Sequence, residues 1–557
     1  MSTPRTTDLG RRAVLAGVPA GLLGTVAAGC SIQIRSEPDP SIGDDTLLVA
    51  GDAGSPTFEK NFNPYLSTSR AATDYIYEPL IVINPLDGKL TPWLASDWEQ
   101  PDPAILRMTL RKGATWHDGT PLTSEDVLFT FDLLKNNPAT DLNGAWNRIR
   151  EIAADEDVIT FRLQTDDVPA LSVIGNTLIV PEHIWTDVDD PGTWRNPDPI
   201  GSGPFQLGSF TPQQYALDRF AEHWQAENVQ LGHIVLPAAN KEEDLVTRGF
   251  DFGYSFISNV DETWGAANEN NKYWFPPGGT IGLQPNFEVA PFDDVRVRRG
   301  LALALDKAKI AEVAVEGHME PASQTGLLLP NHEDLLVDSI PHRGVVQPDR
   351  EAAIESFQEA GFTYDGETMI DPAGEPFSFS ILTANSYTDA LRAVQEIRRQ
   401  LSEIGIAVTI TKPQAAAKEA SQSKGDYEVA FGAAGGGDAY KGYNNLLSSE
   451  FYAPVGETTQ NNRIRFQDED VDELLDRYRS AVDEETQSEI LRNLEEIFYE
   501  QLPIVALYYG ALWGLYNDGR FVGWPSEEDP YAPLQTWGSS LLLIMTRLQP
   551  VGSGVDA

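Results

Sequence analysis

Residues 110–134 read LRKGATWHDGTPLTSEDVLFTFDLL, which combines the end of a strand, a polar turn and the start of a helix. Apolar and polar side chains alternate over residues 106–111, as expected for a strand with one buried face. Thr123 can cap a helix, and Glu125 and Asp126 then fall in its first turn, where the helix dipole favours acids. Apolar residues follow at helical spacing: Val127, Leu128, Phe131 and Leu134. The stretch predicts a strand and a capped helix that share a core.

The second half of the chain changes to an α/β order. Residues 377–382 predict a strand, a helix with a regular apolar stripe ends at Gly405, and residues 406–411 predict another strand. A strand–helix–strand unit of this length predicts a parallel pair. Further helices are expected at 349–360 and 471–501, and further strands at 504–508 and 541–544. The predicted class is α/β with large β-rich insertions.

Composition narrows the function. The chain has 557 residues, of which 41% are hydrophobic and 10% aromatic, enough for two or three domains with real cores. Its net charge of −44 would repel nucleic acids and anionic membrane surfaces, so neither is an expected partner. The charge is spread along the chain and identifies no ligand. Cys30 is the only cysteine, so no disulfide is expected within the mature domains.

Residues 1–29 have the pattern of an export signal rather than of a folded element. Arg11 and Arg12 precede an apolar run over residues 13–28, and small residues follow before Cys30. The sequence GRRAVL at 10–15 resembles the twin-arginine signal, and AAGC at 27–30 resembles the lipobox of lipoproteins. We therefore expect a lipid on Cys30, a spacer over 30–45, and a protein on the outer face of the cell membrane. No later segment reaches the roughly 20 apolar residues of a spanning helix.

Four blocks, in order, resemble the solute-binding proteins of ABC importers, in the family that includes the oligopeptide- and dipeptide-binding proteins. The first is LASDWE at 94–99 together with residues 110–127 of the stretch quoted above. The others are IGSGPF at 200–205, PFDDVRVR at 291–298, and ALD at 304–306. Each block is weak alone, and the ordered set carries the resemblance.

The resemblance implies a periplasmic-binding-protein-like fold with two large hinged lobes and a smaller β-rich domain. Lobe I would be assembled from residues 46–80, 203–288 and 500–550, domain II from 81–202, and lobe III from 289–499. Gly201 and Gly203 are expected hinge residues, because hinges must absorb backbone rotation; a simple glycine turn is the alternative. A monomer that holds a small solute between its lobes and delivers it to the membrane permease is implied.

Two observations bear on the solute. Peptide-binding members typically carry an acid within an aromatic-rich run that resembles FGAAGGGDAY at 431–440, where Ala434 stands at the expected place and Asp438 is displaced. In contrast, YNNLLSS at 443–449, WGLY at 513–516 and GWPSEEDPY at 523–531 resemble the branch that binds cello- and related β-linked oligosaccharides. A β-linked glucan needs aromatic platforms beside amide and carboxylate hydrogen-bonding groups. An oligosaccharide is therefore expected, with a peptide as the alternative.

The candidate ligand-binding residues are aromatic or amide side chains in those segments and near the first strand: Trp264, Trp274, Trp513, Trp524, Tyr443, Asn444, Asn63 and Tyr65. Trp524 can instead buttress its loop, and Asn63 before proline is also an ordinary turn residue. Four tryptophans fit core packing better: Trp98, Trp116, Trp185 and Trp224. The sequence does not distinguish ligand binding from core packing for the remaining four: Trp93, Trp146, Trp194 and Trp537.

An exported hydrolase is the main alternative from another class. The 84 acids guarantee chance carboxylate pairs, so a glycosidase-like pair decides nothing. No Gly-x-Ser-x-Gly motif occurs, the 7 histidines lack metal-ligand spacing, and Gly435–Gly437 is not followed by the lysine of a phosphate loop. We expect no catalytic residue, cofactor or metal. The sequence does not distinguish an importer's sugar-binding protein from a nickel-type binder of the same fold or from a receptor that signals to a sensor.

Overall fold

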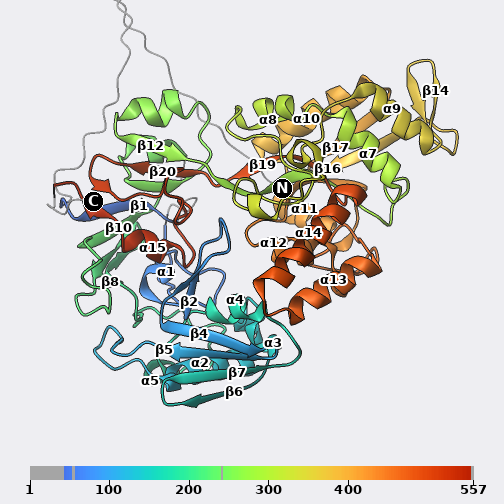
Figure 1. Cartoon of the computed structure of the whole chain (residues 1–557). Helices are drawn as coiled ribbons and strands as arrows, with labels where there is room; N and C mark the ends of the chain where they lie inside the picture. Colours follow the sequence, from blue (N-terminus) through green and yellow to red (C-terminus); the bar gives the residue numbers. More distant parts are fainter. Residues whose placement is uncertain (1–42, 53–56, 240–241, 553–557) are drawn as a thin grey trace, which may run out of the picture. The chain divides into compact units, whose positions relative to one another are not determined.

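The computed structural model describes residues 43–52, 57–239 and 242–552 (Figure 1). The export signal with Arg11 and Arg12, and the expected lipidation site Cys30, lie outside the described residues. Among the helices that are described, none has the length and apolar character needed to cross a membrane.

Lobe I is built on a seven-stranded sheet in the order β12-β20-β11-β1-β10-β9-β8. All residues of β1 (Thr46–Ala50) are buried, and it pairs in parallel with both neighbours, as expected for a central strand. The other strands come from distant parts of the chain: β8 (Phe205–Thr211), β9 (Gln214–Arg219), β10 (His233–Pro237), β11 (Phe252–Tyr254), β12 (Asn271–Trp274) and β20 (Gly514–Asn517).

Domain II confirms the strand and the capped helix that residues 110–134 predict. Its antiparallel sheet has the order β4-β5-β7-β6, in which β5 (Ile105–Leu110) buries Leu106, Met108 and Leu110. Helix α2 (Ser124–Asn136) begins after Thr123, whose N–H donates to the Asp126 carboxylate at 2.9 Å. The remaining strands are β4 (Ala95–Asp102), β6 (Ile149–Asp155) and β7 (Val158–Leu163), with the small pair β2 (Ile81–Ile83) and β3 (Leu90–Pro92).

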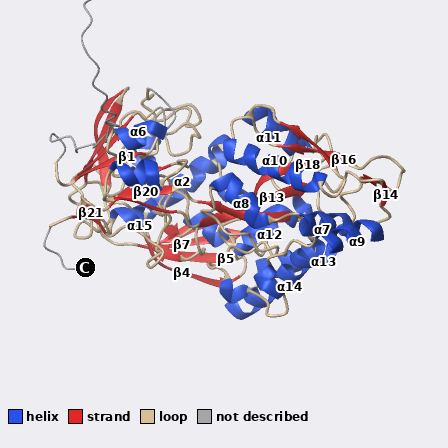
Figure 2. Cartoon of the chain, turned by 90° about the horizontal axis from the view of Figure 1, so that it is seen from above, coloured by secondary structure: helices blue, strands red, loops and turns tan. Residues whose placement is uncertain are grey.

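Lobe III is built on a five-stranded sheet in the order β17-β16-β18-β13-β19. The predicted strand–helix–strand unit is confirmed: β16 (Ser378–Leu382) and β17 (Ala407–Thr411) are parallel and joined through α10 (Thr388–Ser402). The other strands are β13 (Pro277–Pro285), β18 (Val429–Ala434) and β19 (Val505–Ala511). Helices surround this sheet (Figure 2): α7 (Val295–Ala304), α8 (Lys307–Val315), α9 (Arg350–Glu359), α11 (Ala415–Lys424), α12 (Ala439–Leu447), α13 (Glu469–Ser480) and α14 (Glu484–Gln501).

The structure corrects three details of the sequence prediction. Residues 541–544 form part of helix α15 (Leu541–Met545), since a run of four apolar residues cannot distinguish a helix from a strand. The single helix expected over 471–501 is two, because Asp483 caps a new helix by accepting the N–H of Thr486 at 2.8 Å. Strands β13 and β19, expected in lobe I, pair with each other in the lobe III sheet. The chain therefore crosses between the two sheets at 275–276 and 512–513.

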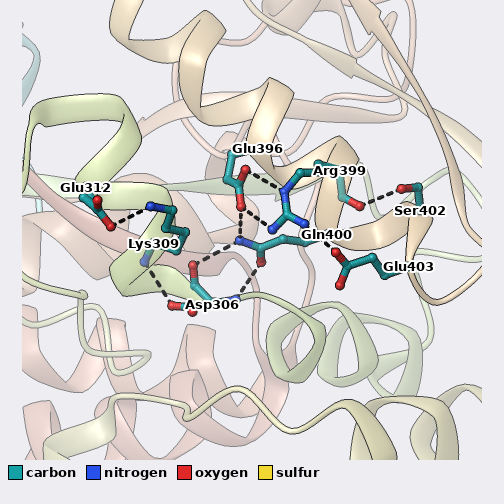
Figure 3. A network of polar contacts seen from close by, with 8 residues as sticks. All are labelled: Asp306, Lys309, Glu312, Glu396, Arg399, Gln400, Ser402 and Glu403. Atoms are coloured by element: carbon teal, nitrogen blue, oxygen red, sulfur yellow. Dashed lines mark hydrogen bonds and ion pairs between the residues drawn. The ribbon is translucent and has the colours of Figure 1, made fainter.

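A polar network fastens α8 to α10 (Figure 3). Gln400 accepts the N–H of Asp306 at 2.7 Å and donates to Glu396 at 2.8 Å, and Glu396 also receives two hydrogen bonds from Arg399. Asp306 in turn caps α8 by accepting the N–H of Lys309 at 2.9 Å. These contacts fix the two helices that cover one face of the lobe III sheet.

Candidate functional site

A cavity of about 730 Å³ lies in lobe III. Its wall combines the end of β18, the start of α10, helices α11 and α12, and the loop 460–463. These elements are distant in sequence, and they meet at the ends of parallel strands. The ends of parallel strands are where α/β sheets commonly bind ligands.

A chain of hydrogen bonds lines the cavity. Lys418 is buried, and its ammonium donates to Gln422 at 2.7 Å and to Glu419 at 3.0 Å. Arg463 donates to the second oxygen of Glu419 at 2.6 Å. Gln422 continues the chain by donating to Gln284 at 2.6 Å, and Gln284 donates to the carbonyl of Ala433 at 2.8 Å. The side chains that form this chain are thus held in fixed orientations.

The two basic groups of this network share one carboxylate. Partial burial raises the pKa of Glu419, but hydrogen bonds from Lys418 and Arg463 outweigh burial and hold that pKa below its usual value. Glu419 therefore stays ionised and offsets one of the two positive charges beside it. Two further charged residues line the cavity, Asp389 and Lys441, for whose carboxylate and ammonium no partner occurs among the described residues.

A glycine loop closes one side of the cavity. Gly435, Gly436 and Gly437 all have positive φ, of 68°, 125° and 66°. A Cβ on Gly436 would lie 2.5 Å from the carbonyl oxygen of Gly278, so only glycine fits there. Asp438 follows and caps α12 by accepting the N–H of Lys441 at 2.7 Å. The residue at the peptide-acid position, Ala434, belongs to β18 and lines the same cavity.

Trp513 and Trp274 lie where the chain crosses between the two large sheets. Trp513 is half-buried, with its ring 4.8 Å from those of both Phe256 and Phe275 in edge-to-face geometry. Trp274 is half-buried at the end of β12, where it pairs with Gly514. Both keep an exposed part, and neither lines the lobe III cavity.

Trp264 and Trp524 have no free ring face in this structure. Trp264 is 1% exposed, and its indole N–H donates to the carbonyl of Lys272 at 2.9 Å. Trp524 is 8% exposed, donates to the carbonyl of Phe521 at 3.0 Å and packs against Phe252, which matches the buttressing alternative. In the conformation described, these two rings are occupied by protein contacts.

The polar candidates are also buried. The Tyr443 hydroxyl donates to the carbonyl of Thr325 at 2.9 Å, and Asn444 beside it is 7% exposed. Asn63 donates to the carbonyls of Pro191 and Trp194, which fits its alternative as a turn residue. Tyr65 donates to the carbonyl of Leu178 at 2.7 Å and lines a second, smaller cavity between lobe I and domain II.

Gly201 and Gly203 lie where the chain returns from domain II to lobe I. A Cβ on Gly201 would lie 1.9 Å from the carbonyl oxygen of Ile76, and one on Gly203 would lie 2.4 Å from that of Tyr75. Neither glycine has a positive φ. Close approach of two backbones is therefore what requires glycine at both positions.

The His117 side chain ties this junction together. Its Nδ1 accepts the N–H of Gly201 at 3.2 Å, so Nε2 carries the proton and donates to the carbonyl of Gly203 at 3.0 Å. Burial lowers the pKa of His117 to about 4, which keeps the imidazole neutral. The backbone N–H of His117 also donates to the carbonyl of Gly201 at 2.9 Å.

The other tryptophans mostly serve packing. Trp116 and Trp185 are 0% and 2% exposed, which confirms the expectation of core positions. Trp93 and Trp224 donate from their indole N–H groups to one oxygen of the buried Glu78, at 2.7 and 3.0 Å. Trp537 differs from these, since it is 41% exposed.

Sequence reasoning missed the residues that line the lobe III cavity. Gln284, Lys418, Gln422 and Arg463 come from β13, α11 and a loop, and no local pattern connects them. The sequence signal nearest to them is the run at 431–440, part of which lines the cavity. It resembles the acid-bearing run of peptide-binding members, and its glycines are not followed by the lysine of a phosphate loop. Among the described residues, no group of three or more histidines, cysteines and acids is placed to hold a metal ion.

The family profile of the bacterial extracellular solute-binding proteins, family 5, matches residues 89–453, which cover most of domain II and most of lobe III. The chain belongs to this family. Its members are the solute-binding components of ABC transporters, so the protein acts outside the cytoplasm and presents a solute to a membrane permease.

Relatives and solved structures agree with the family. An uncharacterised protein of Sinorhizobium fredii is 26% identical, covering 84% of this chain and 78% of its own. The oligopeptide-binding protein AppA of Bacillus subtilis is 24% identical, covering 85% of this chain and 88% of its own.

The periplasmic oligopeptide-binding protein of Thermotoga maritima has the same fold. Its crystal structure gives a TM-score of 0.81 at 24% identity and covers 91% of this chain and 99% of that chain. A second structure of that protein, bound to mannohexaose, gives a TM-score of 0.73 with the same coverage.

Proposed function

We propose that this family 5 protein captures neutral oligosaccharides, cello- or related β-linked, and delivers them unaltered to its permease. The observation that carries the proposal is the chemistry of the lobe III cavity. Six of its lining residues are amides, namely Gln284, Gln422, Asn445, Gln460, Asn461 and Asn462. Amides both donate and accept hydrogen bonds, as sugar hydroxyls require.

Pairing of the basic groups supports a neutral solute. Lys418 and Arg463 both donate to Glu419, so each basic group already has a carboxylate partner. Their N–H groups are held in place by that pairing, and a hydroxyl oxygen can accept from them without desolvating a free ion. The mannohexaose complex of the Thermotoga maritima protein is consistent with this reading.

The proposed mechanism is closure of lobe III on lobe I around the sugar. Trp513 and Trp274 lie at the crossovers between the two sheets, where a sugar face can stack on their exposed parts. Each stacked ring and each satisfied hydroxyl stabilises the closed form, and micromolar affinity corresponds to about 8 kcal/mol. The permease then recognises the closed form. On this proposal Cys30 carries the lipid that retains the protein at the membrane; release of a Cys30→Ser variant into the medium would support the anchor, and full retention would refute it.

Calorimetry with purified protein tests the solute. We expect cellobiose, mannobiose or their longer homologues to bind with micromolar affinity, and a mixture of peptides not to bind. Gln284→Ala should weaken sugar binding about tenfold, because it removes one amide from the cavity and frees the carbonyl of Ala433. Asn136→Ala, which changes an exposed amide on α2, is the matched control.

A peptide is the second candidate, and one observation favours it. Asp389 and Lys441 line the same cavity, and their charged groups have no partner among the described side chains. Opposite charges of this kind suit the amino and carboxyl ends of a peptide. The double variant Asp389→Asn/Lys441→Gln separates the two functions. It should leave sugar affinity within about twofold, whereas peptide binding to the parent protein that disappears in this variant would replace the sugar proposal.

A further inference from the structure

A second cavity, of about 210 Å³, lies at the junction of lobe I and domain II. We call it the junction cavity. Lobe I contributes Asp74 from α1 (Thr73–Ile76) and the pair Gly538–Ser539 that precedes α15. Domain II contributes the loop 140–143 after α2 and residues 176–178 after α4 (Ala170–Gly175). None of its lining residues lines the lobe III cavity.

The junction cavity presents hydrogen-bonding groups without a basic residue. Asp74 receives one hydrogen bond, from the N–H of Gly538 at 2.8 Å, and the carboxylate of Asp141 receives the N–H groups of Ala145 and Trp146. Asn176 accepts from the Ser539 hydroxyl, while its amide N–H groups and the whole amide of Asn143 have no partner among the described residues. Carboxylates that accept and amides that donate are complementary to hydroxyl groups.

Trp537 directly precedes Gly538, which lines this cavity. Its ring is 41% exposed and contacts Tyr254 only edge-to-face, with 4.6 Å between ring centroids. An exposed indole costs hydration free energy unless a partner covers it, and a flat apolar sugar face is such a partner. The cavity is smaller than the roughly 300 Å³ at which pockets for drug-sized ligands begin, so it admits a single ring.

We propose that the junction cavity is a second saccharide subsite that takes one sugar ring, stacked on Trp537 and hydrogen-bonded to Asp74, Asn143 and Asn176. It rests on the proposed function, because it assumes that the solute is a sugar. Burial raises the pKa of Asp74 to about 6 although the Gly538 N–H lowers it, as expected for a carboxyl group that still lacks a second partner. Occupancy would strengthen the contact between Ser539 of lobe I and Asn176 of domain II.

Fluorine NMR of protein labelled with 5-fluorotryptophan tests the subsite. Trp537→Phe assigns the Trp537 resonance, and cellobiose and mannobiose are then titrated in turn. We expect this resonance to shift at saturation, and Trp537→Ala and Asn176→Ala to weaken sugar binding at least fivefold in calorimetry. Asn136→Ala should bind as the parent does. Because Trp537 is exposed, its replacement should leave the melting temperature unchanged, which separates lost binding from lost folding.

The outcomes are distinct. If the sugars bind, but the Trp537 resonance stays still and both variants bind as the parent does, the subsite is refuted while the proposed function stands. If no sugar binds the parent protein, both proposals fail. If calcium alone shifts the Trp537 resonance and the sugars do not, the acids serve a cation and the saccharide subsite is refuted.

Discussion

The junction at Gly201 and Gly203 and the crossovers at 275–276 and 512–513 both connect large parts of the molecule, but they are built differently. At the junction, Gly201 and Gly203 let two backbone segments approach closely, and the His117 ring forms a hydrogen bond with each glycine. At the crossovers, aromatic side chains fill the space, with Trp513 between Phe256 and Phe275. Backbone contact leaves no room for rotation, whereas side-chain packing can rearrange. Glycine in a connecting segment therefore does not by itself indicate a hinge.

This difference suggests which connection moves. The two crossovers run side by side, since the N–H of Leu512 donates to the carbonyl of Pro276 at 2.9 Å. Rotation of lobe III about this pair would change few backbone hydrogen bonds. Rotation at Gly201 would have to break contacts with the carbonyls of Tyr75 and Ile76. We propose that the crossovers carry the closing motion and that the junction stays rigid.

The largest effect is expected at the junction. Gly201→Ala should lower the free energy of unfolding by at least about 3 kcal/mol, because the new Cβ would fall 1.9 Å from a backbone oxygen. Urea titration measures the change. Gly265→Ala is the control, since its Cβ would meet nothing closer than 3.7 Å, and it should cost less than about 1 kcal/mol. Equal stability of the two variants would show that the junction is not tightly packed.

An intermediate effect is expected from His117. Its pKa is lowered to about 4 in the folded protein, from an ordinary value of 6.5. Between these values the unfolded chain binds a proton that the folded chain excludes, so stability from this group is full above pH 6.5 and falls as the pH drops towards 4. Because one pKa unit corresponds to about 1.4 kcal/mol, the loss by pH 4 should be about 3 kcal/mol.

Comparison with His117→Gln isolates the contribution of this imidazole from that of other titrating groups. The stability difference between parent and variant, from urea titrations at pH 7, 6, 5 and 4, should shrink steadily as the pH falls. A difference that is constant over this range would show that His117 titrates normally.

The smallest effect on stability, but a direct one on binding, is expected at the crossovers. Trp513→Ala should weaken sugar binding about tenfold, or about 1.4 kcal/mol, while the protein stays folded, because the ring is only half-buried. Calorimetry measures the affinity and a thermal melt the fold. Trp513→Phe keeps an aromatic ring and should retain most of the affinity; unchanged binding in the alanine variant would remove Trp513 from the site.

Local patterns predicted the elements well where they were long. The alternation before Leu110 and the capped stripe after Thr123 each encode one buried face, so β5 and α2 form as expected. Residues 541–544 were too few to show a period, and the cap at Asp483 was hidden inside an acidic run.

The candidate site was predicted less well, because it depends on what each side chain contacts. The indole N–H groups of Trp264 and Trp524 donate to backbone carbonyls, and the neighbouring sequence does not predict those hydrogen bonds. The cavity-lining Lys418 and Gln284 are linked through Gln422, and only the fold brings α11 and β13 together for that contact. Exposure singled out Trp537, for which the sequence left both roles open.

The crossover pair has one more consequence. Everything from β13 to β19 is one uninterrupted stretch, and its first and last strands are neighbours, with Pro277 opposite Ala511. The stretch also has a hydrophobic core of its own. It is therefore a cassette whose two ends meet at a single point, and a gene recombination event that exchanges it would transplant the amide-lined cavity whole, without reassembling the remainder of the protein.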